Sequence, residues 1–502
     1  MGRGESSAAR RRRGYALGVC VAALLATSCG SDGVATIDVR GARFVAEPQN
    51  LLSTVVTFQT SDDARPRVWV SGPRGRFEVP DSGWLSARAG MAHEVLVLGL
   101  TPETSYQVEI GGAGVRADRS LSFTTAPAPA GLPTLEVRTR DPERIQPGIT
   151  LIGISGPDPG WIAAFDDEGR PVWYHRPDPP VIVTHVQRLR NGHFAYVAGT
   201  NWELIREIDL RGRTVREYGA RAMGLDTLHH DFDELPDGHL LAQTTELVPV
   251  SGFPPAGSGG GPNTLELVAD SLLELDGDAR VVRRWPMLET LAPHRILLDA
   301  LFPYWNDWYP GSSLVRGWCH LNNVSYLPDT DGVVLSALNQ RLVFEMGLAD
   351  GRLRWVLGED DPRTTEDDDW PYLALEEGGR YTARQHDVER LPDGDILVYD
   401  NAIDTLKSRC VRYRIDPARR TARQVWEFID PELTPPAFSL VAGDCDGLGN
   451  GHILVWDPMA TAGLRSRIAE VDPATDTKVW EAFTAPLVGG FDAERLPSIY
   501  PD

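Results

Sequence analysis

Three histidines occupy comparable positions in repeated segments of this sequence. His230 and His386 each lie five residues before the leucine of an LPDG motif, and His320 lies two residues earlier relative to the leucine of LPDTDG. Because the side chains of a strand alternate with a period of two, this offset keeps the three histidines on one face. Converging neutral imidazoles can act as a nucleophile, a general base or an anion-binding group. A lone histidine is more often structural, and we favour that role for His185.

Repeated β-hairpins would position these histidines. Six segments consist of a short aliphatic strand, an acidic turn and a second strand that ends in an aromatic residue. One hairpin cannot bury its apolar face alone, so repetition at intervals of 45, 67, 70, 71 and 54 residues predicts a radial array of small sheets. We therefore predict an all-β chain with a six-bladed β-propeller. The six segments end at Trp173, Tyr218, Trp285, Trp355, Trp426 and Trp480.

A second repeated phrase supplies the other hairpin of five blades. It places an Asn-Gly or Asp-Gly dipeptide before an aliphatic strand, which favours a two-residue turn with positive φ at both central residues. The first blade has no matching turn, and we place its early strand in GITLIGI, residues 148–154. The histidines that follow three of the turns, His193, His239 and His452, are expected to be solvated. The turns are Asn191–Gly192, Asp237–Gly238, Asp331–Gly332, Asp393–Gly394 and Asn450–Gly451.

The first 29 residues have the pattern of an export signal. A basic stretch is followed by an apolar stretch too short to span a bilayer, and then by the residues ATSC, which end at Cys29. This order resembles the lipobox of bacterial lipoproteins, although Ala26 stands where that motif usually has Leu. We expect an exported protein that is lipid-anchored through Cys29 to a bacterial membrane. Ordinary secretory cleavage nearby is the alternative.

The rest of the chain divides into three parts. Residues 35–126 contain several short β segments, and the run from Leu98 to Tyr106 resembles the tyrosine corner of fibronectin type III domains, so we predict a small β-sandwich. Residues 127–145 are rich in Pro and Ala near their start and are expected to be a linker. Residues 146–502 would form the propeller.

Composition restricts partners and cofactors. The net charge of −22 argues against nucleic acid and anionic lipid headgroups as partners. With Cys20 and Cys29 in the export segment, Cys319, Cys410 and Cys445 remain, so at most one internal disulfide forms, and the pair 410–445 is favoured. The spacing of these cysteines matches no zinc site, and we predict no metal and no cofactor.

Two insertions interrupt the repeats. Residues 248–263 are rich in Gly, Pro and Ser and predict a flexible surface loop. Residues 286–318 would either form a lid with aromatic faces for an arene, or pack their aromatic side chains on the rim of the propeller. The aromatic residues concerned are Tyr304, Trp305, Trp308 and Tyr309.

The three histidine segments resemble those of the bacterial arylsulfate sulfotransferases (ASST family). The resemblance covers roughly residues 140–490 and lies in HHDFDELPDGHLL, WCHLNNVSYLPDTDGVVLS and QHDVERLPDGDILVYDN. It implies a β domain followed by a six-bladed propeller, and transfer of a sulfuryl group from an aryl sulfate to a phenol without a nucleotide sulfate donor. By this resemblance His386 is the nucleophile, and His230 and His320 line the site. If protonated, either of these two would meet the leaving phenolate, whose conjugate acid has a pKa of about 10.

One position departs from the family pattern. The arginine that binds the sulfate oxygens in the family corresponds to Leu338 here, and Arg341, three residues later, does not keep the same strand face by simple alternation. Arg341 and Asn322 are the candidate substrate-binding residues, and Asn322 could equally make a strand-end hydrogen bond. Asp231 and Asp387, directly after two of the histidines, are expected to be structural.

The main alternative is a non-catalytic, surface-anchored binding propeller that has lost the sulfate-binding arginine, since a guanidinium supplies bidentate hydrogen bonds to an anion. A metal-dependent hydrolase and a quinone-dependent dehydrogenase are less favoured, because the sequence shows neither a set of acidic ligands nor per-blade Trp-docking motifs. The expected small-molecule partners are an aryl sulfate and a phenol. A homodimer is left open.

Overall fold

The computed structural model describes residues 37–63, 65–86, 91–112, 114–117, 120–156, 160–198, 203–253, 263–297, 304–310, 316–360, 369–460 and 464–501. Within these ranges β-strands dominate, which confirms the all-β prediction. One α-helix is described, α1 (Met287–Thr290), with four short 3-10 helices: η1 (Asp81–Gly83), η2 (Arg221–Met223), η4 (Tyr304–Asp307) and η5 (Leu338–Gln340). No helix in these ranges is long and apolar enough to cross a membrane. The predicted export segment and Cys29 lie outside them.

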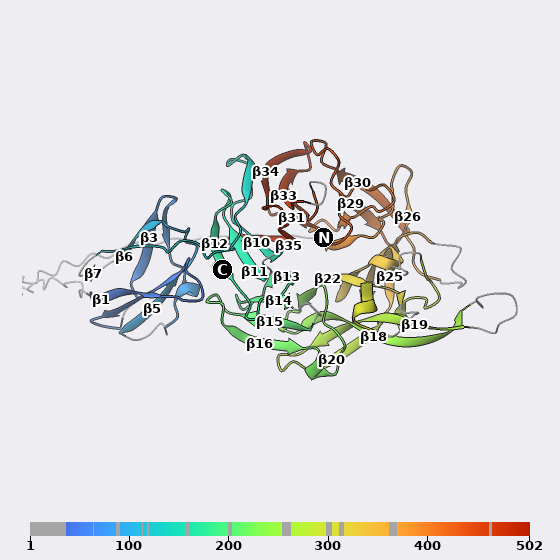
Figure 1. The fold of residues 1–502 in the computed structure, drawn as a ribbon, viewed down its shortest axis with the longest axis horizontal. Coiled ribbons are helices and arrows are strands. Elements are labelled where there is room, and N and C mark those ends of the chain that lie inside the picture. Colours follow the sequence, from blue (N-terminus) through green and yellow to red (C-terminus); the bar gives the residue numbers. More distant parts are fainter. Residues whose placement is uncertain are drawn as a thin grey trace, which may run out of the picture.

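Six sheets form the blades of a β-propeller, as the repeats predict (Figure 1). The first blade closes the ring. Its strand β10 (Ile149–Ser155) pairs on one side with β11 (Trp161–Phe165) and on the other with β35 (Gly489–Leu496), which comes from the C-terminal end of the chain. Blade 1 therefore lacks a tight turn because its two inner strands come from opposite ends of the sequence.

The remaining strands follow chain order from the centre of the propeller outward. Blade 1 ends with β12 (Pro171–His175), and blade 2 contains β13 (Val183–Arg188), β14 (Phe194–Ala198), β15 (Leu204–Ile208) and β16 (Thr214–Gly219). Blade 3 contains β17 (Phe232–Glu234), β18 (Leu240–Phe253), β19 (Asn263–Leu275) and β20 (Val281–Pro286), with β21 (Arg316–Gly317) beside β19. Blade 4 contains β22 (Leu321–Leu327), β23 (Gly332–Ala337), β24 (Leu342–Gly347) and β25 (Leu353–Leu357).

Blades 5 and 6 each carry a fifth strand on the outer edge. Blade 5 contains β27 (His386–Arg390), β28 (Ile396–Asp400), β29 (Arg409–Asp416), β30 (Thr421–Phe428) and the short β26 (Ala374–Leu375). Blade 6 contains β31 (Asp444–Gly447), β32 (Ile453–Asp457), β33 (Arg467–Asp472), β34 (Thr477–Phe483) and β9 (Glu136–Arg140). Part of the segment expected to be a linker is therefore a strand of the propeller.

The six aromatic residues that end the predicted hairpins all lie on the fourth strand of a blade. An indole N–H that is removed from water needs a hydrogen-bond acceptor, and a neighbouring blade can provide one. Three indoles donate to a turn of the next blade at 2.8–2.9 Å: Trp173 to the Leu210 carbonyl, Trp426 to Asp476 Oδ1 and Trp480 to the Asp167 carbonyl. In these three blades the repeated tryptophan therefore links one blade to the next, whereas Trp355 donates to Glu345 of its own blade.

The tight turns differ from the predicted two-residue type. In four of them the glycine has φ of 85–90° and the residue before it does not have positive φ. In the fifth, Asp331 rather than Gly332 has positive φ, at 49°. In the first turn the Leu189 amide donates to the His193 carbonyl and the Gly192 amide donates to the Leu189 carbonyl, which is the pattern of a three-residue loop with a left-handed glycine. The polar residue before the glycine accepts a local hydrogen bond, as Asp237 Oδ1 does from the His239 amide at 3.1 Å.

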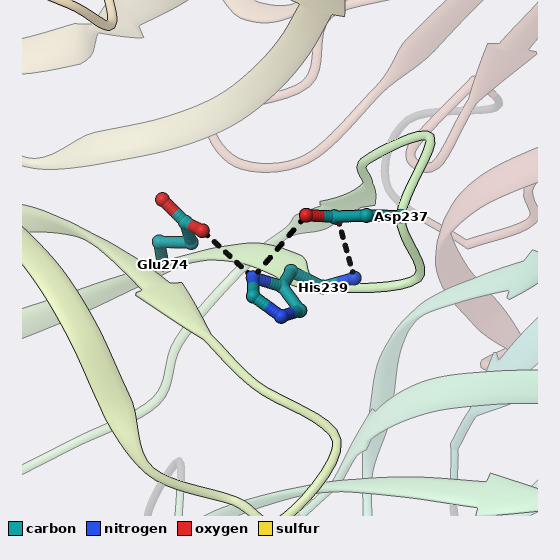
Figure 2. A group of neighbouring side chains, drawn as sticks. All are labelled: Asp237, His239 and Glu274. Atoms are coloured by element: carbon teal, nitrogen blue, oxygen red, sulfur yellow. Dashed lines mark hydrogen bonds and ion pairs between the residues drawn. The ribbon is translucent and has the colours of Figure 1, made fainter.

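The histidines after these turns are not freely solvated, contrary to the prediction. His239 Nδ1 lies 2.7 Å from Glu274 Oε1 on the third strand of its blade (Figure 2). The same contact joins His193 to Glu207 at 2.6 Å and His452 to Glu470 at 2.8 Å. The carboxylate is near because the glutamate lies on the third strand opposite the residue two positions after the histidine, so each pair joins the turn to the third strand.

Two four-stranded sheets form the N-terminal β-sandwich, which lies beside blade 1 (Figure 1). The Tyr106 hydroxyl accepts a hydrogen bond from the Thr101 amide at 3.0 Å, so the tyrosine holds the preceding loop. One sheet contains β5 (Ala92–Val97), β2 (Thr54–Thr60), β1 (Ile37–Ala46) and β7 (Val115–Ala117). The other contains β4 (Gly75–Glu78), β3 (Arg67–Gly72), β6 (Ser105–Gly111) and β8 (Leu121–Thr124).

The C-terminal residues join the sandwich to the propeller. The buried Tyr500 hydroxyl donates to the Leu96 carbonyl at 2.9 Å and accepts from the Leu98 amide at 2.8 Å. The side-chain amide of Asn50, in the sandwich, donates to the Tyr174 carbonyl of blade 1 at 3.0 Å. These buried contacts make the sandwich part of one packed unit with blade 1.

Part of the first insertion is a strand rather than the predicted loop, and its residues 254–262 lie outside the described ranges. Residues 248–253 continue strand β18 and pair with β19 up to Phe253 and Asn263, so this part of the insertion is not a loop. The strands extend well beyond the blade (Figure 1). In the second insertion, Trp305 is 1% exposed and packs beneath the site described below.

Candidate active site

The inner strands of three blades bring the predicted histidines together. His386 begins β27, His320 directly precedes β22, and His230 lies two residues before β17. Each is at least 93% buried. His230 and His320 both have φ of 57°, a left-handed conformation that costs energy for a residue with a Cβ. The three side chains therefore meet at the end of the propeller axis opposite the tight turns.

Asn401 fixes the orientation of the His386 ring. His386 Nδ1 lies 2.7 Å from Asn401 Oδ1, and the Asn401 side-chain amide donates to the carbonyls of Ser439 and Ala442 at 3.0 and 2.9 Å. Because the Asn401 nitrogen is used as a donor, its oxygen must accept, so Nδ1 of His386 carries the proton. The lone pair of the neutral ring is consequently on Nε2.

His230 belongs to a chain of three buried imidazoles. His229 Nδ1 lies 2.8 Å from His230 Nδ1, and His230 Nε2 lies 3.2 Å from His320 Nε2. Each contact needs one proton between two nitrogens, so the chain can pass a proton in either direction. His229 was not singled out in the sequence, because it stands beside His230 and has no counterpart in the other histidine segments.

Burial keeps these histidines neutral. It lowers the pKa of His386 to about 4 and holds the pKa values of His230 and His320 well below the usual range, with neighbouring charges adding to the effect. The expectation that a protonated His230 or His320 awaits the leaving group does not fit this resting state. Asp270, whose pKa burial raises to about 7, accepts the backbone amide of His320 at 2.8 Å and so holds that segment.

A cavity of about 90 Å³ lies against the histidines. The described residues that line it are His230, His320, Leu338, Asn339, Arg384, His386, Val441 and Phe491. Arg384 was missed in the sequence, because it lies two residues before His386 at a place with no equivalent in the other repeats. Its φ of 62° could not be predicted from the residue type. Leu338 is 1% exposed and gives the cavity an apolar wall.

The two predicted substrate-binding residues have different surroundings. Asn322 is buried, lines a second cavity of about 220 Å³ with His230 and His386, and donates to the Gln385 carbonyl at 2.9 Å. Arg341 follows η5 with φ of 51° and is not among the described residues that line either cavity. The turn of η5 separates it from Leu338, so the structure does not bring it to the histidines.

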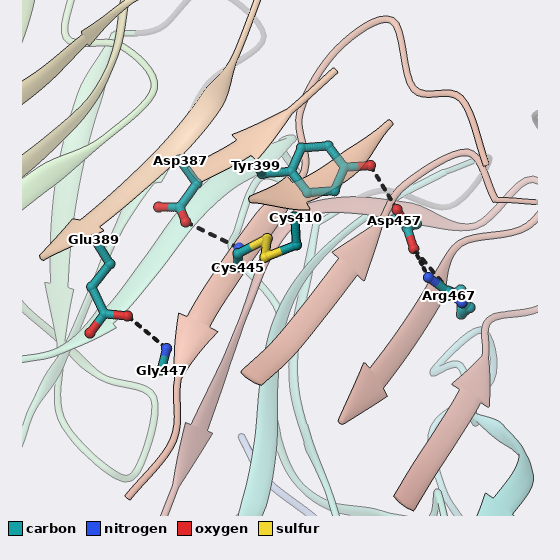
Figure 3. The surroundings of a disulfide bond; sticks show 8 residues. All are labelled: Asp387, Glu389, Tyr399, Cys410, Cys445, Gly447, Asp457 and Arg467. Atoms are coloured by element: carbon teal, nitrogen blue, oxygen red, sulfur yellow. Dashed lines mark hydrogen bonds and ion pairs between the residues drawn. A yellow bond between two sulfur atoms is a disulfide. The ribbon is translucent and has the colours of Figure 1, made fainter. Parts of the chain in front are cut away.

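The second cavity is acidic. Asp231 and Asp387 each accept a backbone amide of the next inner strand, from Val324 at 2.8 Å and from Cys445 at 3.1 Å (the latter in Figure 3). Burial raises the pKa of Asp231 to about 6 and that of Asp387 well above its usual range. These two carboxyl groups therefore link neighbouring inner strands around the propeller axis. The sequence did not show this acidic lining, because its members come from different blades.

His185 lies in this acidic cavity. Its Nε2 is 3.1 Å from Asp231 Oδ1 and its Nδ1 is 2.5 Å from Asp492 Oδ2. Burial opposes protonation, but the two carboxylates outweigh it and raise the pKa of His185 to about 10. His185 is a structural cation that joins blade 1, blade 2 and the His230 segment.

Two groups in the described residues have carboxylate or imidazole atoms close enough to hold a metal ion. Both are explained without one. Asp237, His239 and Glu274 form the turn contact described above (Figure 2), and the same histidine–glutamate pair recurs at two other turns. In the group of Asp387, Asp444 and Asp446, the first two accept backbone amides of the next inner strand.

Cys410 of β29 and Cys445 of β31, the pair favoured in the sequence, form a disulfide between blades 5 and 6 (Figure 3). Beside it, Glu389 accepts the Gly447 amide at 2.6 Å, so hydrogen bonds and a covalent link hold the same two blades. Cys319 is a buried free thiol, and burial raises its pKa well above the usual value.

The aromatic insertion packs against the histidine chain. The Trp305 ring lies with its centre 5.4 Å from that of His229 and 5.7 Å from that of His320. The Tyr309 hydroxyl contacts Thr245 Oγ1 at 2.9 Å. These contacts agree with the packing alternative, in which the insertion supports the site from outside.

Comparison with known proteins matches this architecture to one family. The family model described as arylsulfotransferase (ASST) matches residues 135–485. The arylsulfate sulfotransferase AssT of Escherichia coli O6:H1 (strain CFT073) is 25% identical over 293 residues, and that of Lelliottia amnigena is 21% identical over 295 residues. Each alignment covers 48% of this chain and 46% of the relative, so the chain spans about half the length of the curated relatives it matches.

Solved structures align more weakly. The periplasmic gluconolactonase PpgL of Pseudomonas aeruginosa gives a TM-score of 0.38 at 12% identity, covering 69% of this chain and 98% of that chain. A streptogramin B lyase gives a TM-score of 0.32 at 10% identity, covering 72% of this chain and 100% of that chain.

Proposed function

This chain belongs to the arylsulfotransferase (ASST) family, and we propose that it transfers a sulfuryl group from an aryl sulfate to a phenol through a sulfohistidine on His386, without a nucleotide sulfate donor. The observation that carries the proposal is the convergence of His230, His320 and His386 from three blades on one cavity. A shared cavity is what a nucleophile and its proton-transfer partners need in order to act on one substrate.

His386 is the nucleophile in this proposal. Its Nδ1 proton is hydrogen-bonded to Asn401. Nε2 therefore carries the lone pair and can attack sulfur, while Nδ1 stays protonated. The pKa of about 4 leaves the ring neutral over the whole neutral range. No separate base is then required for the first step, because the attacking nitrogen has no proton to lose.

The chain of His229, His230 and His320 handles the proton of the acceptor. When a phenol attacks the sulfuryl group, its oxygen loses a proton, and a neutral imidazole beside it can accept that proton. The contacts of 2.8 and 3.2 Å along the chain spread this charge away from the reacting atoms. Phe491 and Val441 supply apolar surface for an aryl ring at the cavity.

The test uses 4-nitrophenyl sulfate as donor and phenol as acceptor, with nitrophenolate release followed by absorbance. Wild-type protein should turn over, and mass spectrometry without acceptor should find one sulfuryl group on the peptide that contains His386. His386→Ala should lose nearly all turnover and the adduct. His193→Gln, at a distant turn, is the matched control and should keep both.

A different outcome favours the second candidate, a binding propeller. Leu338 in place of the family's arginine is the observation behind it. If wild-type protein forms no adduct and turns over no aryl sulfate, while it still binds aryl sulfates in calorimetry, the protein is a binding protein and the transferase proposal fails.

We also propose that the protein is exported and anchored to a bacterial membrane through Cys29, on the N-terminal pattern alone. Membrane fractionation of the full precursor and of Cys29→Ala tests this. The anchor is contradicted if both forms are released equally as soluble protein.

A further inference from the structure

Arg384 is the permanently charged side chain among the described residues that line the cavity beside the histidines. Among the described lining residues Arg384 is a guanidinium, the three histidines are neutral, and none is a carboxylate. Arg384 is 7% exposed, so its charge acts in a medium of low dielectric constant. A guanidinium beside neutral side chains supplies charge-assisted hydrogen-bond donors that suit an anion.

The second cavity has a different lining. The second cavity shares His230 and His386 with the first, but its lining contains the carboxyl groups of Asp231, Asp387, Asp444, Asp446, Asp492 and Glu494. His185, the cation described in that lining, already pairs with Asp231 and Asp492, so this side offers a sulfate no guanidinium. Arg384 marks the side from which an aryl sulfate reaches Nε2 of His386.

The backbone brings Arg384 to the nucleophile by an unusual route. Arg384 has φ of 62° and lies immediately outside β27, two residues before His386. A left-handed, non-glycine residue is strained, and such strain persists where the surrounding structure fixes it. Burial lowers the pKa values of His320 and His386, and the positive charge of Arg384 lowers them further. The guanidinium is therefore close enough to act on the reacting groups.

We infer that Arg384 binds the sulfuryl oxygens of the donor and stabilises the charge that develops on them during transfer. This inference rests on the proposed function. Nε2 of His386 donates its electron pair to sulfur, and the bond from sulfur to the aryl oxygen breaks with its pair on that oxygen. The three remaining oxygens stay on sulfur beside Arg384. The aryl oxide gains one proton and the acceptor phenol later releases one, so the cycle consumes none.

Arg384 thereby fills the role that the sequence assigned to the position of Leu338. Both residues line the same small cavity, one as the apolar wall and the other as the cation. The guanidinium comes from blade 5, beside the nucleophile, rather than from the end of β23 in blade 4. A fork of donors on the nucleophile's own segment keeps its position relative to Nε2 if the blades shift.

The experiment measures kcat and KM for 4-nitrophenyl sulfate and, separately, the binding of inorganic sulfate by calorimetry. Arg384→Gln should lower kcat/KM by about 100-fold, as expected for loss of one charge-stabilising group. Arg384→Lys keeps the charge and should recover part of this loss. Leu338→Arg in the Arg384→Gln background should recover part of it as well, which a purely structural role of Arg384 would not allow.

The control is Arg390→Gln at the end of β27, where Arg390 pairs with the exposed Asp329 at 2.8 Å. It should leave both measurements unchanged. Wild-type kcat/KM and sulfate affinity in Arg384→Gln would overturn the inference. If the wild type is inactive towards every aryl sulfate, the proposed function fails, but the calorimetry still tests the anion site. Loss of sulfate binding in Arg384→Gln then supports the site. Absence of sulfate binding to the wild type refutes it.

Discussion

The Nδ1 atom of His386 lies 2.7 Å from Oδ1 of Asn401, and this contact selects the tautomer of the ring. Asn401 directly follows β28. Strand β28 pairs with β27, which begins at His386. Its amide nitrogen is committed to two backbone carbonyls, so the side chain cannot flip without losing both bonds. A single asparagine in blade 5 therefore determines that Nε2 faces the cavity with a lone pair.

Asn401→Ala should lower kcat/KM for an aryl sulfate by about 100-fold, because the proton of His386 can then occupy either nitrogen. Asn401→Asp should retain more activity, since a carboxylate also accepts the Nδ1 proton. Nitrogen NMR of the labelled ring measures the tautomer directly. Equal activity of Asn401→Ala and wild type would show that the orientation of the ring is set elsewhere.

The pH profile should have its acid limit far below the usual range of histidine. Protonation of His386 removes the lone pair, so kcat/KM is full when the ring is neutral and falls as the pH drops through the pKa of about 4. Rates measured from pH 3.5 to 8 in the free enzyme check this, with unfolding monitored at each pH. An acid limit near pH 6.5 would mean that the ring is not desolvated in solution.

Arg384 adds a second test to this profile. Its charge lowers the pKa of His386, so removing it in Arg384→Gln should move the acid limit to higher pH. Arg384→Lys, which keeps the charge, should leave the limit close to that of wild type. A limit that is identical in all three proteins would place the guanidinium away from the nucleophile.

The repeats made the propeller and its histidines predictable, because each blade must bury the same apolar face and place the same turn. What could not be predicted comes from single, unrepeated events. Strand β35 joins blade 1 from the other end of the chain, and Arg384 reaches the cavity through one left-handed φ. The acidic lining, including Asp231, arises from residues of several blades that meet only in three dimensions.

The predicted loop length of the tight turns was wrong. Asn-Gly and Asp-Gly indicate a hairpin correctly, but the loop length depends on which backbone groups pair. Leu189 and His193 close a three-residue loop, so only Gly192 needs the left-handed conformation. His193 contacts Glu207, which lies opposite Ala195 on the neighbouring strand.

His185 should stabilise the protein in a defined pH window. Its folded pKa of about 10 lies above the unfolded value near 6.5, so its contribution is complete below pH 6.5 and is lost as the pH rises towards 10. His185→Gln should lower the free energy of unfolding by about 1–3 kcal/mol at pH 6 and by less at pH 9.5. Urea denaturation at both pH values gives the comparison. A loss that is larger at pH 9.5 would contradict the ion pairs with Asp231 and Asp492.

The disulfide should stabilise the closure of blades 5 and 6. Cys410 and Cys445 are 35 residues apart, and cross-linking a loop of that length lowers the entropy of the unfolded chain enough to contribute about 2–4 kcal/mol. The double variant Cys410→Ala/Cys445→Ala should lose this amount in urea denaturation, and dithiothreitol should reduce the stability of the wild type to a similar level. Cys319→Ala, which removes the free buried thiol, is the control. Dithiothreitol should lower its stability by the same amount as that of the wild type. If the double variant is as stable as the oxidised wild type, the hydrogen bonds between inner strands hold these blades together without the covalent link.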